Sequence, residues 1–131
     1  RPLDGFVFSI TPFNFTSTAA NLPSAPAMLG NTNLWKPAST SVLSNYYMMK
    51  LMEAAGVPPG VINFLPGSGA TVGDPVLADR RFAGIHFTGS TSVFQGIWKT
   101  IANNRVRSAR PPVAPTSRRL SGPTSRSAWP P

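Results

Sequence analysis

Four short apolar segments recur along the first 104 residues, and each has the composition of a buried β-strand. They are rich in Phe, Ile, Val and Leu without regular polar alternation, which is typical of strands covered on both faces of a parallel sheet. The predicted strands are residues 5–10 (GFVFSI), 32–35 (TNLW), 61–65 (VINFL) and 82–87 (FAGIHF).

Apolar positions at helical spacing follow each predicted strand. The predicted helices are residues 16–29, a second helix that begins after a cap at 39 or 40 and stops at 56, a short stretch ending near 77, and about 92–102. The first helix has Thr16 or Ser17 as its candidate N-cap and Gly30 as the glycine that ends it. The second has Ser39 or Thr40 as its candidate N-cap and ends at Gly56. Pro23 and Pro26 lie inside the first helix, so we expect it to be kinked or divided into two pieces.

Strand and helix patterns alternate four times, which predicts the α/β class. The expected fold is a partial Rossmann-like parallel sheet of about four strands with helices on both faces. Right-handed crossovers place all strand-to-helix loops at one edge of such a sheet, where open α/β proteins bind ligands. The four loops predicted to meet there read TPFNF, WKPAS, PGSG and FTGST.

Charge divides the chain into two regions. Residues 1–104 contain six basic and four acidic residues, whereas residues 105–131 contain six arginines and no acids, within a net charge of +8. The second region consists mostly of Arg, Pro, Ser and Ala and lacks periodic apolar positions. It cannot bury enough surface to offset its ordering entropy, so we expect a domain over 1–104 and a disordered basic tail over 105–131.

The absence of cysteine excludes disulfides, thiolate metal sites and cysteine nucleophiles from this chain, and no metal site is predicted. No apolar run reaches the roughly 20 residues that cross a bilayer, and the N-terminal residues do not follow the pattern of a signal peptide. We therefore expect a cytoplasmic protein without membrane partners. A first residue of Arg1 rather than methionine suggests a fragment of a longer protein.

The loop FTGST joins a predicted strand to a predicted helix. Gly89 would let a ligand approach the backbone, and the N–H groups of a helix N-terminus together with the Ser90 hydroxyl suit a phosphate. The alternative is that Thr88 or Ser90 only caps the helix while Gly89 makes the turn. The loop PGSG continues with the spacing G-x-G-x-x-x-G, which departs from the dinucleotide fingerprint, and a turn explains it sufficiently.

Two other polar residues follow predicted strands at the same edge. Lys36 could hydrogen-bond a ribose or a phosphate, or could be a solvated lysine before a helix. The Asn14 amide could stabilise an oxyanion, or could satisfy its own turn. His86 is the only histidine and lies within a predicted buried strand without a partner His or Cys, which favours a structural role.

Taken in order, the motifs TPFNFT, LWKP, PGSG and FTGST resemble those of the aldehyde dehydrogenase superfamily. The stretches NLPSAPAMLGNTNLWKP and FTGSTSVFQGIWKTIANN are similar to its 1-pyrroline-5-carboxylate (glutamate γ-semialdehyde) dehydrogenase branch. The resemblance extends from Arg1 to about Asn104 and implies part of a NAD-binding domain. It also implies NAD as cofactor, an aldehyde of proline catabolism as the substrate of full-length members, and assembly into homo-oligomers.

The resemblance also implies roles for individual residues. Asn14 matches the asparagine that stabilises the oxyanion, Lys36 matches the lysine that binds the adenosine ribose, and Thr11 matches a residue that lines the cofactor. The residues that match the turn beneath the pyrophosphate are Gly89, Ser90, Thr91, Ser92 and Val93. In a eukaryotic cell, the implied compartment is the mitochondrial matrix.

The family reaction needs groups that this sequence lacks. It begins with attack by a cysteine thiolate, and a glutamate later activates water for thioester hydrolysis. No cysteine is present, and Glu53 lies too early to match that glutamate. Ala38 replaces a serine often found after Lys-Pro in this branch, which puts one ribose contact in doubt. We therefore expect the chain alone to be inactive, and we favour a reading-frame shift as the origin of residues 105–131.

A binding module is the alternative class of function. Six arginines within residues 105–131 would support salt-dependent, non-specific contact with nucleic acid or an acidic surface. Trp129 is the only aromatic residue in this region, so base stacking would be sparse and nucleic acid is the less favoured partner. A third hypothesis is a partial nucleotide-binding domain that associates with full-length subunits, since members of the resembled family are oligomers. The exposed edge of a partial sheet would also invite self-association.

Overall fold

The computed structural model describes the backbone of residues 1–107 and the side chains of residues 1–104. Its elements are β1 (Phe6–Ile10), α1 (Thr16–Met28), β2 (Thr32–Lys36), the 3₁₀ turn η1 (Ser39–Ser41), α2 (Val42–Ala54), β3 (Ile62–Phe64), the π-helical turn η2 (Gly69–Gly73), α3 (Asp74–Ala78), β4 (Phe82–Phe87) and α4 (Thr91–Arg107). The predictions of disorder and of a frame shift fall mainly on residues 108–131, which lie outside the described residues.

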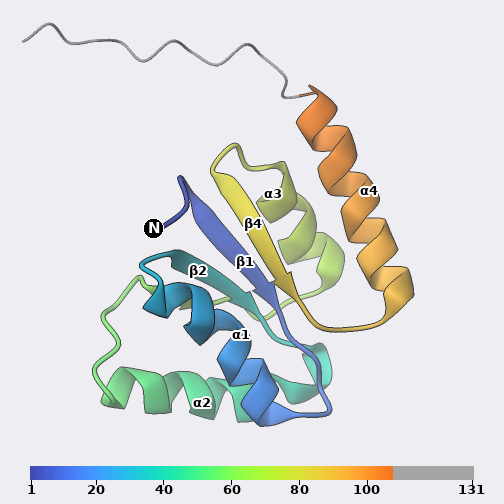
Figure 1. Cartoon of the computed structure of the whole chain (residues 1–131). Coiled ribbons are helices and arrows are strands. Elements are labelled where there is room, and N and C mark those ends of the chain that lie inside the picture. Colours follow the sequence, from blue (N-terminus) through green and yellow to red (C-terminus); the bar gives the residue numbers. More distant parts are fainter. Residues whose placement is uncertain (108–131) are drawn as a thin grey trace, which may run out of the picture.

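The four strands form one parallel sheet in the order β3-β2-β1-β4, which confirms the predicted α/β class. Helices α1 and α2 cover one face of the sheet, and α3 and α4 lie on the other (Figure 1). The chain passes from β1 outward to β2 and β3, then returns to place β4 on the opposite side of β1. The strand order therefore reverses between β1 and β4, and open α/β sheets bind ligands at such a point.

Each face of the sheet has its own apolar core. Phe8, Leu77 and Phe82 form the core beneath α3 and α4. Ala19 and Ile62 pack with Trp35 beneath α1 and α2. The register pairs the last residue of β1 with the last residues of β2 and β4, so three strands end at one level and deliver their loops to the same edge.

The predicted strands are confirmed to within one or two residues. Strand β4 has the predicted bounds, β1 begins one residue later, β2 ends one residue later at Lys36, and β3 is shortened to Ile62–Phe64. Gly30 and Gly56 follow α1 and α2 with positive φ values of 85° and 96°, as predicted for helix-ending glycines.

Helix α1 is one uninterrupted element, so the prediction of two pieces was wrong. Pro26 has no N–H to donate to the Leu22 carbonyl one helical turn earlier. Ser9 Oγ donates to that carbonyl at 3.1 Å, and His86 Nδ1 lies 2.9 Å from it. Neighbouring strands therefore satisfy the acceptor that proline leaves open, and His86 has the structural role expected of it.

The predicted N-caps were also wrong. Phe15 precedes α1 without a side-chain cap, so neither Thr16 nor Ser17 takes that position. Residues 39–41 form a 3₁₀ turn, and α2 begins only at Val42. The N-cap position is taken by Ser41, whose hydroxyl donates to the Ala38 carbonyl at 3.2 Å and accepts from the Asn45 side chain at 3.0 Å, but not from a backbone N–H of the helix.

Helix α4 runs from Thr91 to Arg107, longer than the predicted residues 92–102 and beyond the predicted domain end at 104. The sequence contains no glycine or proline between Gly96 and Pro111, so nothing in this interval breaks a helix. The change of composition at Arg105 therefore does not coincide with the end of the helix.

Candidate functional site

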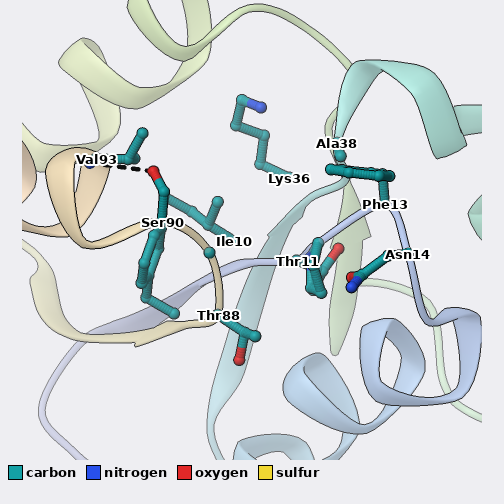
Figure 2. A pocket seen from close by; sticks show the side chains of 12 residues that line it. Ile10, Thr11, Phe13, Asn14, Lys36, Ala38, Thr88, Ser90 and Val93 are labelled. Carbon is teal, nitrogen blue, oxygen red and sulfur yellow. Dashed lines mark hydrogen bonds between the residues drawn. The ribbon is translucent and has the colours of Figure 1, made fainter.

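A pocket of about 450 Å³ lies where the order of the strands reverses. Its lining comes from the carboxyl ends of β1, β2 and β4 and from the first turn of α4. The lining residues are Ile10, Thr11, Pro12, Phe13, Asn14, Lys36, Ala38, Phe87, Thr88, Gly89, Ser90 and Val93. Segments from opposite ends of the described chain thus share one cavity (Figure 2).

The segment after β1 contributes two polar side chains. Thr11 is buried, and its backbone N–H donates to the Lys36 carbonyl at 3.2 Å, which continues the pairing of β1 with β2. Its Oγ1 accepts a hydrogen bond from Trp35 Nε1 at 2.9 Å. The Asn14 side chain is exposed, and its amide makes no hydrogen bond to the other residues that the structure describes. Asn14 is therefore available to a ligand, and it does not satisfy its own turn.

Lys36 is the only basic side chain among the residues that line the pocket. The residue is 8% exposed, and Figure 2 shows it extending between Val93 and Ala38. Among the described residues, its Nζ donates only to the neighbouring Pro37 carbonyl, at 3.2 Å, and burial lowers the pKa of the amine. No acidic side chain belongs to the described lining, so this cation lacks a counter-charge there.

The turn between β4 and α4 closes the other side of the pocket. Ser90 Oγ accepts from the Val93 N–H at 3.4 Å, so Ser90 caps the helix as its alternative interpretation predicted. The remaining N–H groups of the first turn lack intrahelical partners and give this helix end a partial positive charge. A Cβ on Gly89 would lie 2.6 Å from the Phe87 ring, so only glycine fits beside that ring in its present position.

The structure brings together most of the predicted site. Thr11, Asn14, Lys36, Gly89, Ser90 and Val93 line the pocket, whereas Thr91 and Ser92 begin α4 without lining it. The PGSG loop follows β3 at the same edge of the parallel sheet, as predicted, but it does not border the pocket. In that loop, Ser68 Oγ accepts from the Thr71 N–H at 3.0 Å and caps η2.

Sequence reasoning missed the apolar part of the lining. Pro12 and Phe13 lie in the loop that contains Asn14, and Ile10 and Phe87 are the last residues of β1 and β4. Their position next to Asn14 and at the end of a strand was the available signal. In sequence they were indistinguishable from residues of the core.

Two classes of site have no support within residues 1–107. These residues contain no group of three or more His, Cys, Asp or Glu side chains that could hold a metal ion. Across the same stretch, the helices are too short or too polar to span a membrane. The pocket instead offers a buried amine, an amide, a hydroxyl and a helix N-terminus, a donor set that suits an anionic ligand rich in oxygen.

Comparison with known proteins identifies related chains. The mitochondrial delta-1-pyrroline-5-carboxylate dehydrogenase of Dictyostelium discoideum is 57% identical over 106 residues, which cover 81% of this chain and 19% of that protein. The corresponding Rattus norvegicus protein is 47% identical over 104 residues, 79% of this chain and 18% of that protein. Among solved structures, the Mycobacterium tuberculosis delta-pyrroline-5-carboxylate dehydrogenase bound with NAD matches with a TM-score of 0.80 and 58% sequence identity. The match covers 84% of this chain and 21% of that chain.

These relatives extend well beyond the present sequence, since the chain spans about a fifth of the length of each. The model of the aldehyde dehydrogenase family matches residues 1–110, a match that covers every element of the sheet and the whole pocket. It also continues past Asn104, where the resemblance in sequence was expected to end. On this match, together with the shared fold, the chain belongs to the aldehyde dehydrogenase family.

Proposed function

We propose that this chain forms the cofactor-binding part of a NAD-dependent aldehyde dehydrogenase. The proposal rests on the pocket at the point where the strand order reverses between β1 and β4. This pocket is lined by Lys36, which is buried and has no counter-charge in the described lining, and by the N-terminal turn of α4. Both features favour the phosphates and ribose oxygens of a dinucleotide. A related structure of the same fold is bound with NAD, which supports the choice of dinucleotide.

The site residues expected from the sequence each have a place in this proposal. Lys36 hydrogen-bonds the adenosine ribose, and its charge becomes favourable when an anionic ligand fills the pocket. The first turn of α4, with Gly89, Ser90, Thr91, Ser92 and Val93, lies against the pyrophosphate, and Gly89 lets the ligand approach the backbone. Thr11 lines the cofactor beside β1. Bound NAD supplies the acceptor for the hydride of the aldehyde carbon.

Asn14 has the one catalytic role that we assign within this chain. Its exposed amide can donate a hydrogen bond to the oxyanion that forms when a nucleophile attacks an aldehyde. The nucleophile must come from another segment, because this sequence has no cysteine, and the described lining of the pocket includes no carboxylate that could activate water. We therefore expect no NADH formation from the chain alone with glutamate γ-semialdehyde, the substrate that we propose for a longer protein of this branch.

The remaining partners follow from the relatives. We propose a homo-oligomer for the longer protein and, in a eukaryotic cell, the mitochondrial matrix, because several relatives are named as mitochondrial. The alternative function, in which a basic tail contacts nucleic acid or acidic partners, depends mainly on residues 108–131. Those residues lie outside the described part of the chain, and no structural observation favours that function.

Equilibrium titration of the chain with NAD, followed by tryptophan fluorescence, tests the proposal. Wild-type protein should show saturable binding, and Lys36→Ala should weaken it by about tenfold, because a hydrogen bond to a charged donor contributes about 1.5 kcal/mol or more. Lys50→Ala is the matched control, since Lys50 is exposed on α2 and paired with Glu53 at 2.8 Å. Equal affinities in Lys36→Ala and the wild type would contradict the proposed site.

A further inference from the structure

Trp35 occupies the second-last position of β2 and is completely buried. Its ring packs edge-on against Phe64, with centroids 5.1 Å apart, and belongs to the core with Ala19 and Ile62. The surrounding side chains therefore hold the indole in one orientation. That orientation directs the Nε1–H toward Thr11 Oγ1, 2.9 Å away.

This contact determines which way the Thr11 hydroxyl can donate. An indole N–H is only a donor, so the Thr11 oxygen must be the acceptor in the pair. The hydroxyl proton then points away from Trp35, and the described residues give it no acceptor within hydrogen-bond distance. Thr11 is only 2% exposed and is one of the residues that line the pocket, so a ligand in the pocket is the acceptor that we consider for this proton.

We propose that Trp35 is a positioning residue, which fixes the Thr11 hydroxyl as a hydrogen-bond donor to an acceptor oxygen of the bound dinucleotide. The inference rests on the proposed function, because it needs a ligand in the pocket. It adds Thr11 to a lining that already offers two kinds of donor, the Lys36 amine and the N–H groups of the first turn of α4. The buried indole thereby selects a ligand that presents acceptors on the β1 side of the pocket.

A double-mutant cycle on the full chain tests this role. Trp35→Phe keeps the aromatic packing but removes the N–H, and it should weaken NAD binding by about threefold to tenfold. Thr11→Val should weaken binding by a similar factor, and the double variant should bind no more weakly than Thr11→Val. Thr11→Ser keeps the hydroxyl and should stay within about twofold of the wild type.

The NMR signal of the Trp35 indole proton distinguishes a positioning role of Trp35 from a role in packing alone. The indole Nε1–H of Trp35 can be assigned by its loss in Trp35→Phe, and its proton signal should move upfield in Thr11→Val, where the acceptor is missing. Saturation with NAD should shift the same signal in the wild type, because the ligand changes the polarisation of the Thr11 hydroxyl. Trp98→Phe, on the exposed face of α4, is the matched control and should leave NAD affinity unchanged.

The possible results distinguish this inference from the proposed function. Saturable NAD binding with non-additive effects of the Thr11 and Trp35 substitutions supports both. Saturable binding with additive effects, or with an affinity that Trp35→Phe leaves unchanged in a folded protein, overturns the role of Trp35 and leaves the proposed function standing. An absence of NAD binding in a folded wild-type chain overturns both.

Discussion

Lys36 shows, at the scale of a single residue, how a binding group destabilises the protein that carries it. A buried amine loses hydration, and here only a backbone carbonyl replaces the lost water. The lowered pKa of Lys36 is the direct sign of this cost, because burial disfavours the charged form. An anionic ligand removes the cost by supplying the missing counter-charge, so affinity and ligand-free stability are opposed at this position.

We therefore predict that Lys36→Met stabilises the ligand-free chain while weakening NAD binding. Methionine has a similar length and needs no hydration, so Tm at neutral pH should rise by about 2–4 °C, equivalent to about 0.5 kcal/mol. Differential scanning calorimetry of the two proteins without ligand measures this difference. A lower Tm for the variant would show that the amine is satisfied in the ligand-free protein.

The pH dependence of this difference has a definite sign. The folded chain has the lower Lys36 pKa, so the unfolded chain binds more protons between that value and the ordinary 10.5 of lysine. The stability of the wild type relative to Lys36→Met should therefore increase as pH rises through this window. The advantage of Lys36→Met is complete below the folded pKa and fades above it.

At the scale of elements, a buried polar chain connects α1 to the sheet. Asn33 Nδ2 donates to Ser9 Oγ at 2.8 Å, and Ser9 donates in turn to the Leu22 carbonyl, which Pro26 leaves without a helical partner. Asn33 Oδ1 has no partner among the described residues although it is buried. The chain of hydrogen bonds compensates for the proline and depends on Ser9 at its centre.

We predict that Ser9→Ala lowers the free energy of unfolding by about 1–3 kcal/mol, because it leaves the whole Asn33 amide without a partner in the core. The double variant Ser9→Ala with Asn33→Leu should recover most of this loss, since both polar partners are then replaced by apolar groups. Urea unfolding measures the three stabilities. Ser24→Ala is the control, because the Ser24 hydroxyl bonds only its own helix. Equal losses in the single and double variants would contradict this explanation.

The same network shows which features of the elements the sequence could predict. Apolar runs located all four strands, because burial on both faces requires such composition. Continuity of α1 through two prolines was not predictable, since it depends on Ser9 and His86, which are remote in sequence from Leu22. The N-caps failed for a related reason, because the Ser41 hydroxyl donates to the Ala38 carbonyl and accepts from the Asn45 side chain, not from a backbone N–H of α2.

At the scale of the whole molecule, the order of the strands decides which loops meet. Alternation along the sequence predicted a parallel sheet but left the order β3-β2-β1-β4 undetermined. In that order the end of β3 lies two strands away from β1, which explains why PGSG does not reach the pocket. Lys36, on the strand next to β1, does reach it. Most of the polar residues that line the pocket were therefore candidates from the sequence, whereas its apolar lining and the exclusion of PGSG depend on the fold.

Thermal unfolding of the purified chain with and without NAD tests the central claim, that these loops form a cofactor site within this sequence. We predict one cooperative transition whose Tm rises with NAD concentration. At about ten times the dissociation constant, the gain should be about 1.4 kcal/mol, or about 6–11 °C for a domain of this size. A cooperative transition that NAD leaves unchanged, or the absence of any cooperative transition, would contradict the account.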